Sequence, residues 1–329
     1  MESHICLAVD IGGSKLDIGL VNAEGELVGQ AEKHRVPFDE RGIADPKGLI
    51  ELLVPFIERV EGLSMRFHGI GLSVCGNIDR ETGEAILVPN LHWRNINFGR
   101  MVEERFGCRV FSATDVRMAA LAEVVWGAAK NSRNFAWATI GTGYGGYLFL
   151  DGKLYGGYHG FAGNFGHNTL DEVNGYPCGC GRRGCVETFV AGPAIARAGQ
   201  AAASAGHSPA IAELSSGGPV TPQMVFQAEA RGDSTAREII EQEVRMVSIS
   251  LAGLVNILDL EMIVLGGGVT HATPDFIQRI SQRMRDFLMT AEAARDLRVV
   301  PESFFNSALY GSAADVFINT EILPLGPFD

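Results

Sequence analysis

The chain carries ICLAVDIGGSKLDIGLVNAEG at residues 5–25, and this stretch decides the expected fold. An apolar run from Ile5 to Asp10 leads into a glycine turn, and a second apolar run ends at the turn Asn22–Gly25. This pattern predicts a buried strand, a glycine turn, a second strand and a hairpin. Most glycines at hairpins are structural, but a glycine turn after a strand can also expose backbone amides to a phosphate group.

A similar unit occurs further along the chain. Residues 134–140, NFAWATI, precede the glycine turn Gly141–Gly146, which is followed by YLFL and the turn Asp151–Lys153. The repetition predicts two related halves. A third glycine turn follows the apolar run EMIVL at residues 261–265. Three such turns in one chain indicate a nucleotide-binding protein.

The rest of the chain alternates between expected strands and helices. GIGLSV at 69–74 and RVFSA at 109–113 have the composition of buried strands, whereas residues 117–129 and 234–258 have helical patterns. Asp45 and Pro46 are a plausible cap and first turn for another helix. Such alternation predicts an α/β fold with largely parallel sheets.

Composition and charge exclude several classes of protein. The chain has 329 residues, of which 46% are hydrophobic and 20% charged, as in an ordinary folded protein. A formal net charge of −12 disfavours a nucleic-acid partner. No basic segment precedes an apolar run at the N-terminus, and no apolar stretch approaches membrane-spanning length. We therefore expect a cytoplasmic protein without a membrane or nucleic-acid partner.

Two common nucleotide-binding motifs do not explain the glycine turns. Gly141, Gly143 and Gly146 fit the spacing of the dinucleotide fingerprint, but that motif opens a helix and here a strand pattern follows. The chain also lacks the Gly-x-x-x-x-Gly-Lys-Ser/Thr loop of P-loop enzymes. The remaining arrangement is the two-hairpin phosphate clamp of actin-like kinases.

The glycine motifs resemble those of the actin-like kinases. AVDIGGSK at 8–15 and ATIGTGYGG at 138–146 look like the two phosphate motifs, and EMIVLGGG at 261–268 looks like the adenosine motif. AGNFGH at 162–167, followed by CGCGRRGCVE at 178–187, is similar to the signature of the ROK family (repressor, open reading frame, kinase). The resemblance implies that ATP contacts Asp10, Gly12, Gly13, Ser14, Lys15, Gly141, Thr142, Gly143, Gly266, Gly267 and Gly268.

The same resemblance implies an architecture. The family has a two-domain actin-like (ribonuclease H-like) α/β fold, in which ATP and a sugar bind between the lobes, and it forms homodimers. Two domains also suit the chain length. We expect a small N-terminal α/β domain at 1–116, joined by a C-terminal helix at about 307–329, and a larger α/β domain at 117–306 that contains the cysteine cluster.

Three of the six cysteines lie close together in a glycine-rich loop. Clustered thiols in a reducing compartment indicate a metal more than disulfides. His167, Cys178, Cys180 and Cys185 would give a closed tetrahedral zinc site of structural type, which is also what the resemblance implies. The alternative is three buried thiols and a core histidine, but such a loop offers little apolar packing.

Asp115 is the candidate catalytic base. It follows the strand RVFSA, and the carboxyl ends of strands are where open α/β sheets bind ligands. A base there could take the proton of a sugar hydroxyl while magnesium neutralises the phosphates. Asp115 could equally be a helix cap. The resemblance of TDVRMAALAE, residues 114–123, to the family segment that bears the catalytic aspartate favours the base.

The resemblance also places sugar contacts and exposes departures from the family pattern. Asn164 stands where the family usually has Glu, Thr114 where it has Asn, and Cys75 where Pro is common. Glucose, N-acetylmannosamine, allose and fructose therefore all stay open as substrates. The expected sugar-binding residues are Gly76, Asn90, Thr114, Asp115, Asn164, His167 and Glu187.

Several of these residues also have an ordinary structural interpretation. Asn90 could be a turn asparagine, and Glu187 a solvated glutamate at a helix start. Asp10 could hold a magnesium-bound water or only satisfy nearby amides, and Lys15 could neutralise phosphate or be a solvated strand residue.

The hypothesis that the sequence favours is a sugar kinase that uses ATP, Mg²⁺ and a structural Zn²⁺ and acts on the 6-hydroxyl. Its alternatives are a sugar-sensing regulator and a non-catalytic sugar-binding protein. The first expected strand begins near His4, which leaves no room for a DNA-binding module before it.

Overall fold

The computed structural model describes residues 3–79 and 82–325. Residue contacts separate the chain into two compact units. The first unit consists of Met1–Asn131, Gly152–Leu154 and Glu302–Asp329, and the second of Ser132–Asp151 and Tyr155–Pro301. A boundary after residue 116, as the sequence suggested, would divide a helix that the structure keeps whole in the first unit.

That helix is α3 (Asp115–Val125), and it packs on α11 (Ser307–Asn319). Leu121 and Val125 of α3 form a buried cluster with Ala314 of α11. The two helices approach so closely that a Cβ atom at Gly311 would overlap the carbonyl group of Met118. This packing is the physical reason why α3 belongs with the first unit.

The first unit is built on a five-stranded sheet with the order β3-β2-β1-β4-β8. β1, β4 and β8 are parallel to one another, whereas β2 is antiparallel to both β1 and β3. The two expected strands at 69–74 and 109–113 are confirmed as β4 and β8. The strands are β1 (His4–Ile11), β2 (Lys15–Asn22), β3 (Glu32–Arg35), β4 (Arg66–Val74) and β8 (Val110–Thr114).

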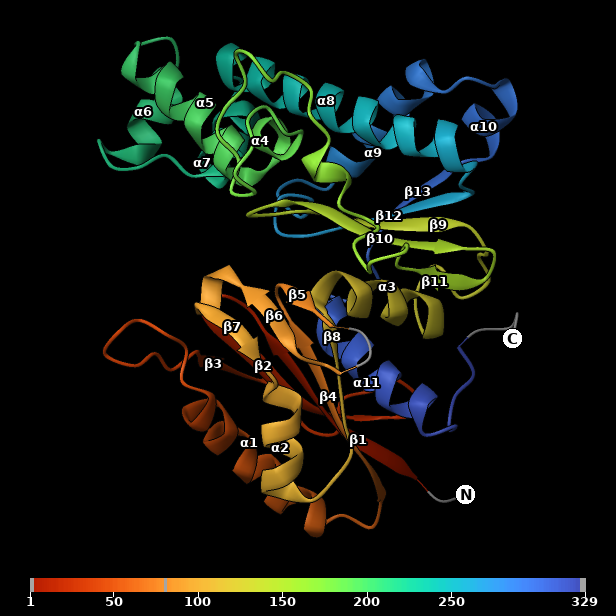
Figure 1. The fold of residues 1–329 in the computed structure, drawn as a ribbon. Helices are drawn as coiled ribbons and strands as arrows, with labels where there is room; N and C mark the ends of the chain where they lie inside the picture. Colours follow the sequence, from red (N-terminus) through yellow and green to blue (C-terminus); the bar gives the residue numbers. More distant parts are fainter. Residues whose placement is uncertain (1–2, 80–81, 326–329) are drawn as a thin grey trace. The chain divides into compact units, whose positions relative to one another are not determined.

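Alternation of side chains along β1 gives this sheet two buried faces. Ile5, Leu7 and Val9 lie in the cluster that contains the apolar residues of α1 (Pro46–Glu61) and α2 (Phe98–Phe106). Cys6 and Ala8 face the opposite way, against α11. Figure 1 shows α1 and α2 side by side on one face of the sheet and α11 on the other. Successive residues of a strand point to opposite faces, so an apolar strand must be covered on both.

A small three-stranded sheet lies between β4 and α2 in the sequence. Its strands are β5 (Asn77–Ile78), β6 (Ala85–Val88) and β7 (Trp93–Ile96), in that order. The short 3₁₀ helix η1 (Pro89–Leu91) connects β6 to β7. The indole of Trp93 is buried and its Nε1–H donates to the carbonyl oxygen of Ala44 at 2.8 Å. This bond attaches the small sheet to the segment that precedes α1.

The second unit repeats the strand order of the first. Its sheet has the order β11-β10-β9-β12-β13, with β10 antiparallel to β9 and with β9, β12 and β13 parallel. The prediction of two related halves is confirmed by this shared topology. The strands are β9 (Phe135–Ile140), β10 (Tyr144–Leu150), β11 (Lys153–Tyr155), β12 (Met262–Gly266) and β13 (Arg298–Pro301).

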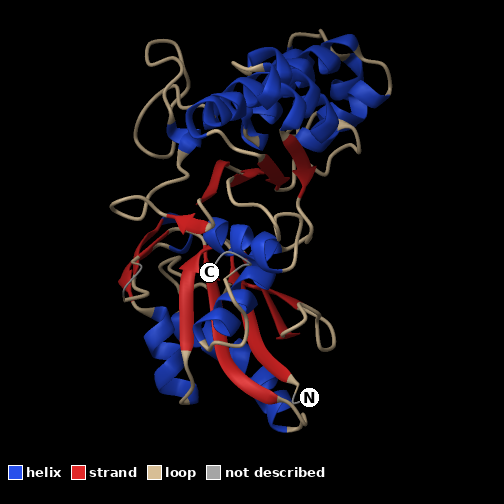
Figure 2. Cartoon of the chain, turned by 90° about the vertical axis from the view of Figure 1, so that its right-hand side faces the viewer, coloured by secondary structure: helices blue, strands red, loops and turns tan. Residues whose placement is uncertain are grey.

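A layer of helices covers one face of the second sheet (Figure 2). The longest is α8 (Ser234–Leu258), which has the bounds that its sequence pattern predicts. Its buried Val247 and Leu251 belong to the same core as Ala136 and Ala138 of β9. The other helices are α4 (Glu187–Val190), α5 (Gly192–Ser204), α6 (Pro209–Ser215), α7 (Pro222–Ala230), α9 (Phe276–Met284) and α10 (Ala291–Asp296), with 3₁₀ turns η2 (Phe165–His167) and η3 (Arg285–Phe287).

Among the described helices, none combines the length and the apolar character that crossing a bilayer requires.

Candidate functional site

The carboxyl edge of the first sheet gathers the polar residues at its strand ends. Asp10 of β1 pairs in register with Ser73 of β4, and Val74 of β4 pairs with Thr114 of β8. The Ser73 hydroxyl donates to Asp10 Oδ1 at 2.7 Å. Parallel strands end at the same edge of a sheet, which is where open α/β sheets bind ligands. The two predicted carboxylates, Asp10 and Asp115, therefore belong to one edge.

Asp115 is the first residue of α3, directly after β8. Its Oδ1 accepts the backbone N–H of Val116 at 2.9 Å. Burial raises the pKa of Asp115, and hydrogen bonds from the backbone N–H groups of Val116 and Asp115 offset part of this rise. A carboxylate with a raised pKa accepts a proton more readily than one exposed to water, as a general base requires. Thr114 is the N-cap residue of α3, and its side chain makes no capping hydrogen bond.

Burial also raises the pKa of Asp10, to about 7. The hydrogen bond from Ser73 opposes this rise, while the nearby charge of Asp115 adds to it. The influence of Asp115 on Asp10 shows that the two carboxyl groups interact electrostatically. An acidic edge of this kind is suited to a hard cation such as Mg²⁺, which prefers oxygen ligands.

The first glycine turn lies next to these carboxyl groups. The Gly12 N–H donates to the carbonyl oxygen of Lys15 at 2.9 Å and closes the turn between β1 and β2. A Cβ atom at Gly13 would lie 2.7 Å from Cβ of Asn90, so the turn packs directly on η1. The structure thus brings Gly12, Gly13 and Asn90 together, while Ser14 and Lys15 are exposed.

Gly76 is confined by its own backbone conformation and by β6. Its φ is +151°, and a Cβ atom there would lie 2.8 Å from the carbonyl oxygen of Leu87. The preceding residue, Cys75, donates its backbone N–H to the carbonyl oxygen of Ile11 at 3.2 Å. A larger residue at position 76 would therefore displace the segment that borders the first glycine turn.

The second and third glycine turns lie side by side in the second unit. β9 and β12 are parallel, and Thr139 pairs with Gly266 at their carboxyl ends. The Val269 N–H donates to the carbonyl oxygen of Ile140 at 2.9 Å. Gly267 has a φ of +94°, and a Cβ atom there would lie 2.5 Å from Oγ1 of Thr139. The backbones of the two turns can approach closely because Gly267 has no Cβ atom.

The four predicted metal ligands form one cluster. One ligand atom from each of His167, Cys178, Cys180 and Cys185 lies within 4.8 Å of all the others. The His167 Nδ1 atom is 3.6 Å from the Cys178 Sγ atom, and the Sγ atoms of Cys180 and Cys185 are also 3.6 Å apart. Three thiolates and one imidazole are a soft ligand set that fits zinc and leaves no ligand position for water.

The loop that holds this cluster is folded by backbone hydrogen bonds. Leu170 N–H donates to the carbonyl oxygen of Gly184 at 2.8 Å, and Cys178 N–H donates to that of Arg182 at 2.8 Å. Burial raises the pKa of the Cys178 thiol to about 12. A metal ion must displace this proton when it binds, so its affinity should increase with pH.

Glu187 connects the Cys3His cluster to the second glycine turn. It is the first residue of α4, and its Oε2 accepts the backbone N–H of Tyr144 at 3.0 Å. Its Oε1 lies 3.5 Å from the Cys178 Sγ atom. Nearby, the side-chain amide of Asn164 donates to the carbonyl oxygen of Phe161 at 2.9 Å. A glutamate at position 164 could not make this bond, because a carboxylate has no N–H group.

The sequence-predicted site residues divide between the two units. Those of the first unit lie at or beside its acidic edge: Asp10, Gly12, Gly13, Ser14, Lys15, Gly76, Asn90, Thr114 and Asp115. Those of the second unit lie on the paired glycine turns, or in the loop that holds the cysteines and at its two ends: Gly141, Thr142, Gly143, Gly266, Gly267, Gly268, Asn164, His167, Cys178, Cys180, Cys185 and Glu187. Sequence reasoning missed Ser73, because a serine inside a buried strand carries no motif.

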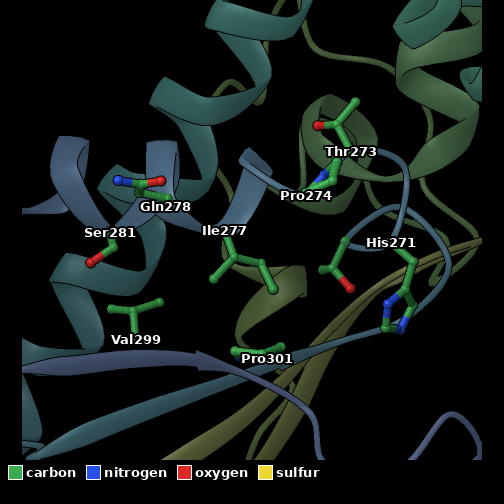
Figure 3. Close-up of a pocket in the computed structure, with 9 residues that line it drawn as sticks. His271, Thr273, Pro274, Ile277, Gln278, Ser281, Val299 and Pro301 are labelled. Atoms are coloured by element: carbon green, nitrogen blue, oxygen red, sulfur yellow. The ribbon is translucent and has the colours of Figure 1, made fainter.

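A pocket of about 480 Å³ opens just beyond the third glycine turn (Figure 3). Ile277 of α9 and Val299 and Pro301 of β13 supply apolar lining, and Thr270 and His271 close one side. Thr273 also lines it, and its buried hydroxyl oxygen has no hydrogen-bond partner among the residues that the structure describes. A mostly apolar pocket with an unused polar atom is suited to a flat heterocycle.

Comparisons of the sequence and of the structure with known proteins lead to the same family. Residues 6–318 match the family model described as ROK family. A glucokinase from Halalkalibacterium halodurans is 28% identical over 96% of the chain and 94% of its own length. A xylose repressor from Caldicellulosiruptor bescii is 28% identical over 84% of the chain and 69% of its own length. The crystal structure of a ROK family glucokinase from Streptomyces griseus, in complex with glucose and AMPPNP, is 26% identical and has a TM-score of 0.79, over 94% of the chain and 98% of its own length.

Proposed function

The chain belongs to the ROK family, and from that premise we propose that it transfers the terminal phosphate of ATP to a hydroxyl group of a hexose or N-acetylhexosamine. The fold is the two-unit α/β fold of the actin-like kinases. The proposal rests on the position of Asp115, a half-buried carboxylate at the carboxyl edge of the sheet that also holds the first glycine turn, where desolvation raises its pKa.

In this proposal Asp115 accepts the proton of the attacking sugar hydroxyl. Its hydrogen bond with Val116 N–H fixes one carboxylate oxygen and leaves the other for the substrate. Asn90, beside Gly13, would bind the sugar hydroxyls through its side-chain amide. Thr114 would bind them through its hydroxyl, which makes no capping hydrogen bond to α3. The acceptor is expected to be the primary 6-hydroxyl, because it is the most accessible hydroxyl of a hexose.

The phosphates of ATP would bind to the backbone amides of the glycine turns, with Lys15 close to their charge. Asp10 would hold the Mg²⁺ ion through its water shell. Mg²⁺ neutralises the developing charge on the phosphates when it is bound. The pocket beyond Gly268 would receive the adenine ring against Ile277 and Val299. An Ile277→Trp substitution should then fill the pocket and raise KM for ATP without changing the affinity for sugar.

Zinc would be a structural ion in the cysteine cluster. Its role would be to hold the loop between Asn164 and Glu187 in one conformation, so that His167, Asn164 and Glu187 can bind sugar hydroxyls. His167 would bind zinc through Nδ1, which faces Cys178, and keep Nε2 for the sugar.

A sugar-sensing regulator is the second candidate, because the xylose repressor aligns with 84% of the chain. We also propose that the protein works in the cytoplasm, where a reducing environment keeps the zinc-binding thiols reduced, and that it forms a homodimer. Size-exclusion chromatography with light scattering tests the second of these proposals.

The experiment that tests the function is a coupled ADP-release assay on zinc-replete protein with Mg²⁺ and ATP. The sugar panel contains glucose, N-acetylmannosamine, allose and fructose. Sugar-dependent ADP release is the expected result, and the preferred sugar names the substrate. Sugar binding in the absence of any ADP release would favour the regulator or a non-catalytic sugar-binding protein.

A further inference from the structure

Asn306 joins three elements of the first unit. It is the N-cap residue of α11, where its Oδ1 accepts the Leu309 N–H at 3.3 Å. Its Nδ2–H donates to Asp17 Oδ2 at 2.9 Å. The Asn306 side chain also opposes the rise in the pKa of Asp10, which lies directly opposite Asp17 in the β1–β2 pair. A single amide therefore caps a helix and binds Asp17, whose cross-strand neighbour is Asp10.

The two carboxylates need such a partner because of the strand register. Asp10 of β1 and Asp17 of β2 are directly opposite each other in the antiparallel pair. Like charges in that position destabilise a strand pair. Lys33 lies 3.5 Å from Asp17 but is half exposed, so water screens much of its charge. Asn306 offers two N–H groups on one nitrogen, which allows one donor for each carboxylate.

The location of this contact gives it a functional consequence. Asp10 and Asp17 flank the first glycine turn on both sides, and α11 packs against α3, which begins at Asp115. We propose that Asn306 is a positioning residue, which holds the Asp10–Asp17 pair together and thereby fixes the first glycine turn for the phosphates of ATP. The assignment of the turn to ATP rests on the proposed kinase function.

Substitutions at position 306 can separate this role from helix capping. Serine and aspartate are good N-cap residues, so Asn306→Ser and Asn306→Asp should keep the cap of α11. Serine lacks the amide donors, and aspartate adds a third carboxylate. The double variant Asp17→Asn/Asn306→Asp exchanges the amide and the carboxylate between the two positions, so it restores one amide donor and the original net charge. Asn97→Ser is the matched control, because Asn97 caps α2 and donates to the Thr82 carbonyl oxygen instead.

The test measures two properties of the full chain: steady-state kinetics with Mg²⁺ and ATP, and hydrogen exchange of the backbone amides at residues 11–16. We expect Asn306→Asp to raise KM for Mg·ATP about tenfold, the effect of losing one hydrogen bond to a charged group, and to speed exchange in the turn. Asn306→Ser should show the same effects more weakly. The exchanged double variant should recover much of the loss, and Asn97→Ser should match the wild type.

Two results would overturn the assignment: unchanged exchange in the turn of Asn306→Asp, or an equal effect of Asn97→Ser. Failure of the exchanged double variant to improve on Asn306→Asp would also count against it. If the wild type shows no kinase activity, the proposed function is refuted independently of the role of Asn306. The exchange measurement still decides whether Asn306 holds the turn.

Discussion

Replacement of Gly143 by alanine should disturb the carboxylate of Glu187, the proposed sugar ligand, without unfolding the protein. The new Cβ atom would lie 2.7 Å from Glu187 Oε2, whereas an ordinary contact begins at 3.4 Å. The carboxylate oxygen must therefore retreat by about 0.7 Å. Only the end of one side chain has to move, and the backbone of Gly143 does not have a left-handed φ, so the fold should survive.

The retreat should break the hydrogen bond that fixes Glu187. Its Oε2 accepts the Tyr144 N–H at 3.0 Å, and a further 0.7 Å exceeds hydrogen-bond reach. Loss of a hydrogen bond to a charged group costs about 1.5–3 kcal/mol. If Glu187 binds the sugar, kcat/KM for the sugar should fall about 10- to 100-fold.

Steady-state kinetics with the preferred sugar is the assay, together with thermal unfolding. The matched control is Gly145→Ala in the same hairpin, where the new Cβ atom would lie 3.8 Å from the Gly163 carbonyl oxygen, an ordinary contact. The control should retain wild-type kinetics. A Gly143→Ala variant with unchanged kcat/KM for the sugar would refute the role of Glu187.

Three further predictions follow from the acidic edge and the cysteine cluster. Asp115→Asn should lower kcat by about 10²- to 10⁴-fold, because an amide cannot act as the base. The unfolding temperature should change little, since the asparagine oxygen can still accept the Val116 N–H. Wild-type turnover of this variant would exclude Asp115 as the base. Cys185→Ser should remove zinc, measured by metal analysis, and lower the unfolding temperature by about 5–10 °C; a metal-free wild type would contradict the zinc site. Asp10→Asn should stabilise the protein more at pH 8 than at pH 5. Burial raises the pKa of Asp10 to about 7 in the folded state, above its value in the unfolded chain. The contribution of Asp10 to stability is therefore complete at a pH below the unfolded-state pKa and is lost as the pH rises through 7, whereas asparagine carries no charge at either pH. Equal melting shifts at both pH values would contradict this.

Local patterns predicted the strands β1, β2, β4, β8, β9, β10 and β12, the longest helix and the composition of the Cys3His cluster. They did not predict the edge strands β3, β11 and β13 or the small three-stranded sheet. α8 follows its apolar periodicity, and Cys178, Cys180 and Cys185 are close together in the sequence. The boundary between the units was not predictable in the same way, because α3 belongs with α11 through packing between residues far apart in the chain. Asn306 was missed for the same reason: its partner Asp17 is 289 residues away, and only the folded sheet brings them together.

Phosphorus NMR of a reaction with the preferred sugar follows phosphate transfer from ATP to the sugar itself. For a sugar kinase, the γ-phosphate signal of ATP should decay while a phosphomonoester signal and the signals of ADP grow at the same rate, and Asp115→Asn should suppress both changes. ATP that stays intact in the presence of bound sugar, or that yields only inorganic phosphate, would contradict a sugar kinase.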